Sequence, residues 1–472
     1  MIKIIKKHVE LHHKTYNKAL IPLSKKPIFF KKNDSIMKAK LLLFIGLCMF
    51  VACKENKPAK PTATDVEYLH AAQKKLTDII ITDIFTPPVA SRVYVYPMLA
   101  AYEAGKFTKA DAASITAQLK GFEAMPTPES GKSYNYTVAA IKALCTTSKK
   151  VIFSTKDIDA FEAKTFDELK GSMTEEVFNN SISFGESVAA VVIKRLESDN
   201  YKETRGMERF EVKADMKGRW VPTTPDYADG VEPHWGKLKT MVMDSSSQCR
   251  PAAPPPFSED KKSLFWKDLD EVYNISKTVV EERENIMVFW DDNPFVSRSK
   301  GHLMFQDKKM TPGGHWLAIC QTFLKDRKVG FYESLRAYTL TSLALFEGFI
   351  CSFEAKYHYV LVRPETVISA KIDKQWHPLL VTPAFPSYTS AHSTVSGSAA
   401  EVLTALFGDN QAYTDETEKE YGLPVRSFKS FREAALEASI SRVYAGIHYR
   451  FDCDKGNESG RKVGQLVISK IK

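Results

Sequence analysis

Residues 334–353 read SLRAYTLTSLALFEGFICSF, a long apolar stretch that ends shortly before the basic residues Lys356 and Arg363. The stretch is too long for an ordinary strand, and its apolar residues recur at spacings of three and four, which predicts a helix over about 330–356. The same spacing recurs along most of the chain, whereas period-two alternation is scarce. The sequence therefore predicts an all-α fold.

The other expected helices lie on both sides of this stretch. They cover residues 66–85, 91–104, 109–124, 133–148, 156–169, 174–198, 259–286, 311–325, 390–407, 428–445 and 453–470. No internal repeat divides them. We expect one large helical bundle domain over residues 66–472.

Residues 206–260 interrupt the helical pattern with Trp220-Val-Pro-Thr-Thr-Pro, Glu232-Pro-His-Trp-Gly and a run of prolines from Pro254. Tryptophan is costly to leave exposed, so we expect an ordered loop that lies over the helical body. The stretch around His234 and Trp235 fits a cover for a site entrance and a structural clamp equally well.

Charge is concentrated near the N-terminus. The net charge is +9, but residues 1–36 alone hold nine lysines against two acidic residues, and Lys38 and Lys40 add two more positive charges. The chain after Cys53 is close to neutral. Its composition, 44% apolar and 26% charged, is that of an ordinary globular protein, and nothing in it indicates a nucleic-acid partner.

The basic segment is followed by a pattern typical of export. Residues 37–53 hold a charged start, an apolar run of about a dozen residues and Ala52-Cys53, which is similar to a bacterial lipoprotein signal. We expect lipidation at Cys53, an anchor in the periplasm or outer membrane, and a linker over 54–65. Residues 1–36 fit an overcalled start or a disordered lead. An uncleaved N-terminal anchor is the alternative.

The cysteines contribute little to the functional prediction. Five follow the signal, scattered and without a Cys-x-x-Cys pair, so zinc and redox motifs are excluded. Buried free thiols are expected, with one disulfide as the alternative in an oxidising compartment. The five are Cys145, Cys249, Cys320, Cys351 and Cys453.

Three blocks between residues 330 and 470 carry the chemistry. They are Lys356-x6-Arg363-Pro, then Phe385-Pro-Ser-Tyr-Thr-Ser390-Ala391-His392, and finally Ser441-Arg442-x5-His448-x3-Asp452. Taken singly, each has a plain structural explanation: a solvated charge, a helix cap, or a surface pair at i,i+4. Their combination, in this order, indicates a shared site.

The residue types suit a tetrahedral oxyanion such as vanadate or phosphate. Lys356, Arg363 and Arg442 supply positive charge, and the two guanidinium groups can each contact a pair of oxygens. Ser390 adds a hydroxyl donor, and the backbone N–H of Ala391 lies at the start of an expected helix, where anions are favoured.

The three blocks resemble the Lys-x6-Arg-Pro, Pro-Ser-Gly-His and Ser-Arg-x5-His-x3-Asp signatures of vanadium-dependent haloperoxidases and type 2 phosphatidic acid phosphatases. The resemblance is closest over 330–470 and extends to Thr86-Pro-Pro-Val-Ala-Ser-Arg and Thr311-Pro-Gly-Gly-His-Trp, which are similar to the bacterial haloperoxidase branch. The implied fold is the helical bundle of the haloperoxidase and acid phosphatase type. The chain departs from the signature at Ala391, where the family has glycine. Its methyl group is small but disfavours positive φ, and we expect oxyanion binding to survive this change.

The resemblance also implies roles. His448 would be the apical ligand of vanadium, or the phosphorylated nucleophile of a phosphatase. His392 would be the acid–base residue, and Asp452 would fix the tautomer of His448. Lys356, Arg363, Ser390, Ala391 and Arg442 would hold the oxyanion.

Vanadate mimics phosphate, so the motifs alone leave the activity open. Phe385, seven residues before His392, stands where the family's peroxidases often place an aromatic near the halide pocket, and the helical N-terminal half is longer than a minimal acid phosphatase needs. The spacings from Arg363 to Ser390 and from His392 to Arg442 resemble those of bacterial iodide- and bromide-oxidising members. The resemblance therefore favours a haloperoxidase that uses vanadate, hydrogen peroxide and iodide or bromide rather than chloride. The alternatives are a periplasmic phosphatase acting on a small phosphate ester without a cofactor, and a binding protein that has lost catalysis. A homodimer is also compatible with the resemblance. His315-Trp316 is expected to pack as a helix start rather than line the pocket.

Overall fold

The computed structural model describes residues 64–472, apart from 279, 295, 301–302 and 308. The expected basic extension and lipoprotein signal, residues 1–53, lie outside the described residues. In the described part, the chain is built of helices with two short hairpins, so the all-α prediction is confirmed.

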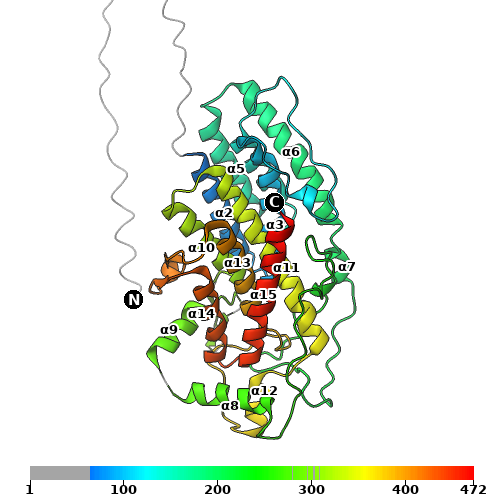
Figure 1. The fold of residues 1–472 in the computed structure, drawn as a ribbon, viewed down its shortest axis with the longest axis vertical. Helices are drawn as coiled ribbons and strands as arrows, with labels where there is room; N and C mark the ends of the chain where they lie inside the picture. Colours follow the sequence, from blue (N-terminus) through cyan, green and yellow to red (C-terminus); the bar gives the residue numbers. More distant parts are fainter. Residues whose placement is uncertain (1–63, 279, 295, 301–302, 308) are drawn as a thin grey trace, which may run out of the picture. The chain divides into compact units, whose positions relative to one another are not determined.

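In the described residues, the first half of the chain contains α-helices α2 to α7, drawn in blue to green in Figure 1, and α3 packs against α4, α6 and α2. Their bounds are α2 Asp65–Thr82, α3 Pro87–Gly105, α4 Tyr136–Ser148, α5 Thr155–Lys170, α6 Glu175–Glu197 and α7 Tyr201–Arg205. Short 3-10 turns cover Lys106–Thr108, Thr116–Gln118 and Trp235–Lys237. Helix α3 is buried along its length and packs against α11, which joins this half to the second.

The second half holds the motif-bearing helices (Figure 1). Their bounds are α8 Leu264–Lys277, α9 Glu281–Phe289, α10 Pro312–Asp326, α11 Phe331–Tyr359, α12 Pro364–Lys371, α13 Ala391–Phe407, α14 Phe431–Tyr444 and α15 Arg450–Lys470, with a 3-10 turn at Thr417–Tyr421. Helix α13 packs against α11, α14 and α15 and lies at the centre of this half. The core is therefore formed by the elements that carry the motifs.

Side-chain caps explain where several of these helices start. Thr86 and Thr311 each accept a hydrogen bond from the backbone N–H three residues on, and each precedes a proline at the first helical position. Ser390 does the same for α13 without a proline. The first-turn positions of these helices are thus fixed by the sequence itself.

The expected helix over 109–124 is wrong. Its backbone turns through positive φ at Asp111 (61°) and Gly121 (80°), and the segment wraps around the buried carboxylate of Glu103. That carboxylate accepts hydrogen bonds from the Thr116 N–H (2.9 Å) and the Ser114 hydroxyl (3.0 Å). A tertiary hydrogen-bond acceptor here overrides the local helical periodicity.

Two hairpins were not expected. Strand β1 Val296–Lys300 pairs antiparallel with β2 Leu303–Asp307, and β3 Tyr413–Asp415 pairs with β4 Arg426–Phe428. The helix predicted from residue 428 begins instead at Phe431, after the Ser430 cap.

The other long helix predictions need smaller corrections. The helix expected over 259–286 divides into α8 and α9, because Thr278 and Val280 have extended backbones. Helix α15 begins at Arg450, three residues before the predicted start.

The region over 206–260 is the long loop that the sequence predicts, with one short turn in it. Its Trp220 and Trp235 are fully buried. The five cysteines after the signal are buried and free, as expected. Within the described residues, no helix combines the length and apolar character needed to cross a membrane.

Candidate active site

The three sequence blocks meet where α11 ends, α13 begins and α14 turns into α15. Three hydrogen bonds join them: Lys356 Nζ to Ser387 O (3.0 Å), Arg363 Nη1 to His448 Nε2 (3.1 Å), and Ser387 Oγ to Asp452 Oδ2 (2.5 Å). Each block is bonded to another, so the residues predicted to share a site are brought together.

Two glycines of α15 allow this close approach. A Cβ on Gly456 would lie 2.7 Å from the carbonyl oxygen of Ser390, and one on Gly460 would overlap the carbonyl of Thr394. Without side chains at these positions α13 can lie directly against α15. As a result, the Ser390 N–H donates to the Asp452 carbonyl at 3.1 Å.

Lys356 and Arg363 are fully buried and are held by backbone carbonyls. Lys356, in the last turn of α11, donates to Pro386 O at 2.9 Å and to Ser387 O at 3.0 Å. Arg363, the residue that precedes α12, donates to Phe385 O at 2.9 Å and to Ile447 O at 2.7 Å. The loop before α13 thus fixes both cations.

Arg442 supplies the third positive charge from the last turn of α14. Its Nε donates to Ser441 Oγ at 2.9 Å, and its Nη2 donates to the carbonyl of Trp290 at 2.5 Å. Trp290 follows α9, so a segment outside the three blocks orients this guanidinium.

The charges of these three cations are poorly balanced. In the part of the chain that the structure describes, none of them pairs with a carboxylate; their partners are carbonyls, a hydroxyl and one imidazole. Burial and the neighbouring Arg363 hold the pKa of Lys356 well below its usual value, and burial lowers the pKa of Arg363 to about 10. A bound anion would relieve this cost.

The tautomer of His448 follows from its two neighbours. Arg363 can only donate, so the Nε2 atom of His448 must offer its lone pair. The proton is therefore on Nδ1, which donates to Asp452 Oδ2 at 2.9 Å. Burial and the nearby cations keep the pKa of His448 well below its ordinary value. The ring is therefore neutral, and the lone pair of Nε2 is directed at the cation cluster.

Asp452 serves both the site and the fold. Its Oδ2 also accepts from the Tyr449 N–H at 3.3 Å, which caps the start of α15. Burial raises the pKa of Asp452 to about 7, while the Ser387 hydrogen bond and the charge of Lys356 oppose that shift.

The start of α13 supplies further donors. The Ser390 hydroxyl accepts from Ser393 Oγ at 2.9 Å, so it can use its own proton as a donor. Ala391 is the first residue of the helix, and its backbone is not among the positive-φ positions of the described chain. The methyl group in place of the family's glycine therefore causes no backbone strain here.

His392 lies beside a carboxylate that the sequence analysis did not single out. Its Nε2 is 3.1 Å from Asp292 Oδ2, an ion-pair distance, although the ring N–H is not directed at that oxygen. Burial and Arg442 lower the pKa of His392, and Asp292 opposes that shift. At neutral pH the ring is therefore neutral and able to accept a proton.

A cavity of about 400 Å³ opens onto these groups. His392, Arg442, His448 and Ala391 line its polar end. The rest is mostly apolar and includes Phe349, Phe353, Phe385, Pro87, Pro88, Val381 and the loop segment around Thr224 and Val231. The long loop thus contributes Thr223, Thr224, Pro225, Asp226, Ala228 and Val231 to the cavity. Trp235 packs in the core, and His234 contacts the Glu208 carbonyl at 2.7 Å.

One solved structure covers nearly all of the described chain. It is 42% identical in sequence with a TM-score of 0.82, and the match spans 88% of this chain and 99% of that one. It is described as the first bacterial vanadium-dependent iodoperoxidase. The chain belongs to the vanadium-dependent haloperoxidase family.

Other comparisons agree with this assignment. The family model for the second helical-bundle domain of the VCPO type matches residues 336–472. Holo and apo structures of a bacterial vanadium-dependent chloroperoxidase share the fold at 17% identity, with TM-scores of 0.63 and 0.64, and cover 85% and 88% of this chain and 97% and 98% of theirs. No curated protein matches the chain.

The residues present fit the oxyanion cofactor that gives this family its name. Three buried cations lack a carboxylate partner among the described residues, and the lone pair of His448 Nε2 faces one of them. A negatively charged group with an electrophilic centre satisfies both features: its oxygens balance the cations, and its centre takes the Nε2 lone pair.

Asp292 and its neighbours were missed by the sequence analysis. Asp292 follows α9 in Trp290-Asp-Asp-Asn-Pro, a block with no helical periodicity and no recognised spacing to the motifs. His315 does sit in the first turn of α10, as predicted, and it does not line the cavity. It is nevertheless bonded to Asp292, and the paired aspartates beside a tryptophan were the available signal.

Proposed function

We propose that this chain oxidises halide with hydrogen peroxide at a vanadate site, and that iodide or bromide is a better substrate than chloride. The observation that carries the proposal is the unbalanced cluster of buried cations around a neutral His448. The 42% identity to an iodoperoxidase supports the reaction class and favours iodide.

Lys356, Arg363 and Arg442 would hold the oxygens of vanadate, together with the Ser390 hydroxyl and the Ala391 N–H. His448 Nε2 would be the ligand of the metal. Arg363 now donates to that atom, so binding requires its guanidinium to turn from Nε2 towards the incoming oxygens. Vanadate, when bound, would supply the Lewis acid that activates hydrogen peroxide.

The remaining residues would manage protons. His392 is neutral at neutral pH because burial lowers its pKa, so it can accept a proton from hydrogen peroxide and return it to the leaving oxygen. Asp452 keeps the proton of His448 on Nδ1 and thereby keeps Nε2 available as a ligand.

The cavity supports the halide preference. Phe385 lies beneath the cations, with its ring centre 4.7 Å from Lys356 Nζ and 5.3 Å from that of Phe353. An anion that enters an apolar cavity loses water contacts that the wall does not replace, and this costs free energy. Iodide is the most weakly hydrated of the three halides and therefore loses least.

Parallel assays on one preparation test the proposal against the phosphatase alternative. Residues 66–472 are purified, stripped of metal, and assayed for iodide and bromide oxidation with and without added vanadate. The same samples are assayed for hydrolysis of a phosphate monoester. We expect oxidation that depends on vanadate. Ester hydrolysis through a phosphohistidine on His448, inhibited by vanadate and without halide oxidation, would replace the proposal.

We also propose that the enzyme is exported and anchored in the periplasm or outer membrane through a lipidated Cys53. The support is the order of charged, apolar and cysteine residues over 37–53, which lie outside the described residues. Mass spectrometry of the membrane fraction should find an acylated Cys53 at the N-terminus; a chain that begins at Met1 would contradict this. Light scattering of the purified protein tests for the homodimer that the sequence analysis leaves open.

A further inference from the structure

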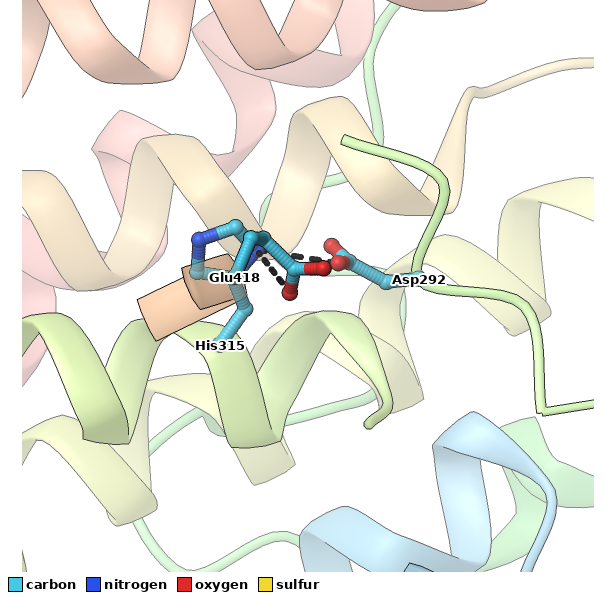
Figure 2. Close-up of side chains that lie close together, drawn as sticks. All are labelled: Asp292, His315 and Glu418. Carbon is cyan, nitrogen blue, oxygen red and sulfur yellow. Dashed lines mark hydrogen bonds and ion pairs between the residues drawn. The ribbon is translucent and has the colours of Figure 1, made fainter. Parts of the chain in front are cut away.

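His315 lies behind the acid–base histidine, between two carboxylates. Its Nδ1 is 2.9 Å from Asp292 Oδ1, and its Nε2 is 3.1 Å from Asp415 Oδ2. All three side chains are exposed by 1% or less. Figure 2 shows the ring of His315 turned towards Asp292, with Glu418 beside it.

Two carboxylates at opposite ring nitrogens make His315 an imidazolium. Burial disfavours its charge, but Asp292 and Asp415 outweigh burial and raise the pKa of His315 well above its usual value. In turn, burial disfavours the charge of Asp292, and His315 and His392 outweigh it and hold the pKa of Asp292 well below its usual value. The three groups form a compact chain of alternating charge.

Asp292 connects this chain to the active site. One of its oxygens faces His315, and the other lies 3.1 Å from His392 Nε2. The Asp292 carboxylate would therefore stabilise a proton taken up by His392 during turnover, and His315 fixes the position of that carboxylate. His315 also stacks on Trp290, with ring centres 4.6 Å apart, and the Trp290 carbonyl holds Arg442.

A cation bound by Asp292, His315 and Glu418, whose ligand atoms lie within 4.8 Å of one another, is the competing explanation for this cluster. The direct 2.9 Å contact between Nδ1 and Oδ1 already satisfies both atoms with a proton. Glu418 is 3.9 Å from Nδ1, and burial raises its pKa to about 8, so it is a neutral acid at neutral pH. Both ring nitrogens of His315 thus have a carboxylate partner without an ion.

We propose that His315 and Asp415 are positioning residues for His392, which they serve by fixing the Asp292 carboxylate against its imidazole. Only the expected change in kcat/KM rests on the proposed function. Neither His315 nor Asp415 touches the cavity, and the positioning acts through Asp292.

The charged groups that face His392 set the direction of the expected effect. They are Asp292, which favours its protonated form, Arg442 and His315, which are positive and disfavour it, and the neutral His448. Asp292, Asp415 and Glu418 face His315. Replacing the imidazolium by a neutral group removes a charge that opposes protonation of His392, so His392 should titrate at higher pH.

The test compares His315→Gln with Asp415→Asn and with His70→Gln. Asp415→Asn keeps the size of the side chain and an acceptor for the ring. His70 is the matched control, because it is another buried histidine, bonded to Tyr338 at 2.7 Å and far from the site in sequence and packing. Steady-state kinetics with hydrogen peroxide and iodide are measured across pH, together with thermal stability.

His315→Gln should lower kcat/KM for hydrogen peroxide by about 10- to 100-fold, as loss of a supporting partner commonly does, and move the controlling ionisation to higher pH. Asp415→Asn removes a negative charge from the same cluster, so it should move this ionisation to lower pH, and by less because Asp415 lies on the far side of His315. His70→Gln should lower stability alone. A pH profile and kcat/KM unchanged in His315→Gln and Asp415→Asn would overturn the proposal.

A second readout does not depend on turnover. NMR of the protein labelled at histidine follows the titration of His392 directly, before vanadate is added. A shifted titration in His315→Gln supports the positioning role even if no halide oxidation is found, in which case only the proposed function fails. An unshifted titration of His392 would overturn the proposal. So would a divalent metal that is bound in stoichiometric amount and whose removal by a chelator changes the His315 resonance.

Discussion

Asp452→Asn distinguishes two ways in which the site can hold an anion: through a bond to His448 Nε2, and through the charges of the cations alone. Asp452 Oδ2 accepts from His448 Nδ1, Ser387 Oγ and the Tyr449 N–H, so the carboxylate cannot leave without disturbing all three. An asparagine can offer its NH₂ group to Nδ1 and so favour the tautomer with the proton on Nε2. That tautomer has no lone pair for vanadium.

The magnitude follows from the contact that is lost. Groups that orient a ligand histidine are commonly worth about 10- to 100-fold in metal affinity, or about 1.4–2.7 kcal/mol. Phosphate needs the cations but no bond to Nε2. Removing one negative charge near Lys356 and Arg363 should leave phosphate binding unchanged or slightly tighter.

The assay is titration of the metal-free protein with vanadate and, separately, with inorganic phosphate, followed by intrinsic fluorescence. Asp454→Asn is the control, because Asp454 is an exposed carboxylate two residues further along α15. We expect Asp452→Asn to weaken vanadate binding relative to phosphate by about 10- to 100-fold. If the affinities for vanadate and phosphate fall equally, the tautomer argument is wrong and Asp452 serves only to cap α15.

Three further outcomes are expected. His448→Ala should abolish halide oxidation and leave weak anion binding, because the three cations remain; retained oxidation would exclude His448 as the ligand. His392→Ala should retain vanadate in the same titration and lose about 10²- to 10⁴-fold in turnover. Vanadate affinity should fall as pH rises, because burial and Arg363 lower the pKa of Lys356 and its ammonium is therefore lost at lower pH than that of an ordinary lysine; an affinity that stays constant from neutral to alkaline pH would contradict this.

The sequence predicted the elements in which local pattern and burial agree. Helix α11 has apolar residues on every side, and α13 starts at a serine cap, so both were predicted within a few residues. The segment over 109–124 failed because Glu103, which lies earlier in the chain, draws its backbone into a turn. No local pattern reports such a contact.

Part of the site could be predicted from the sequence and part could not. The motif residues have fixed spacings and could be named from the chain. Asp292 and Asp415 could not, because they lie 23 and 100 residues from His315 and meet it only through packing. Their chemistry depends on burial beside a histidine, and sequence spacing contains no information on that contact.

A crystal structure of the chain soaked with vanadate tests the central claim most directly. We expect density for vanadium bonded to His448 Nε2, with the Arg363 guanidinium moved off that nitrogen and onto an oxygen of the anion, beside Lys356 and Arg442. Vanadate bound elsewhere, or held only by the cations while Arg363 still donates to Nε2, would contradict it.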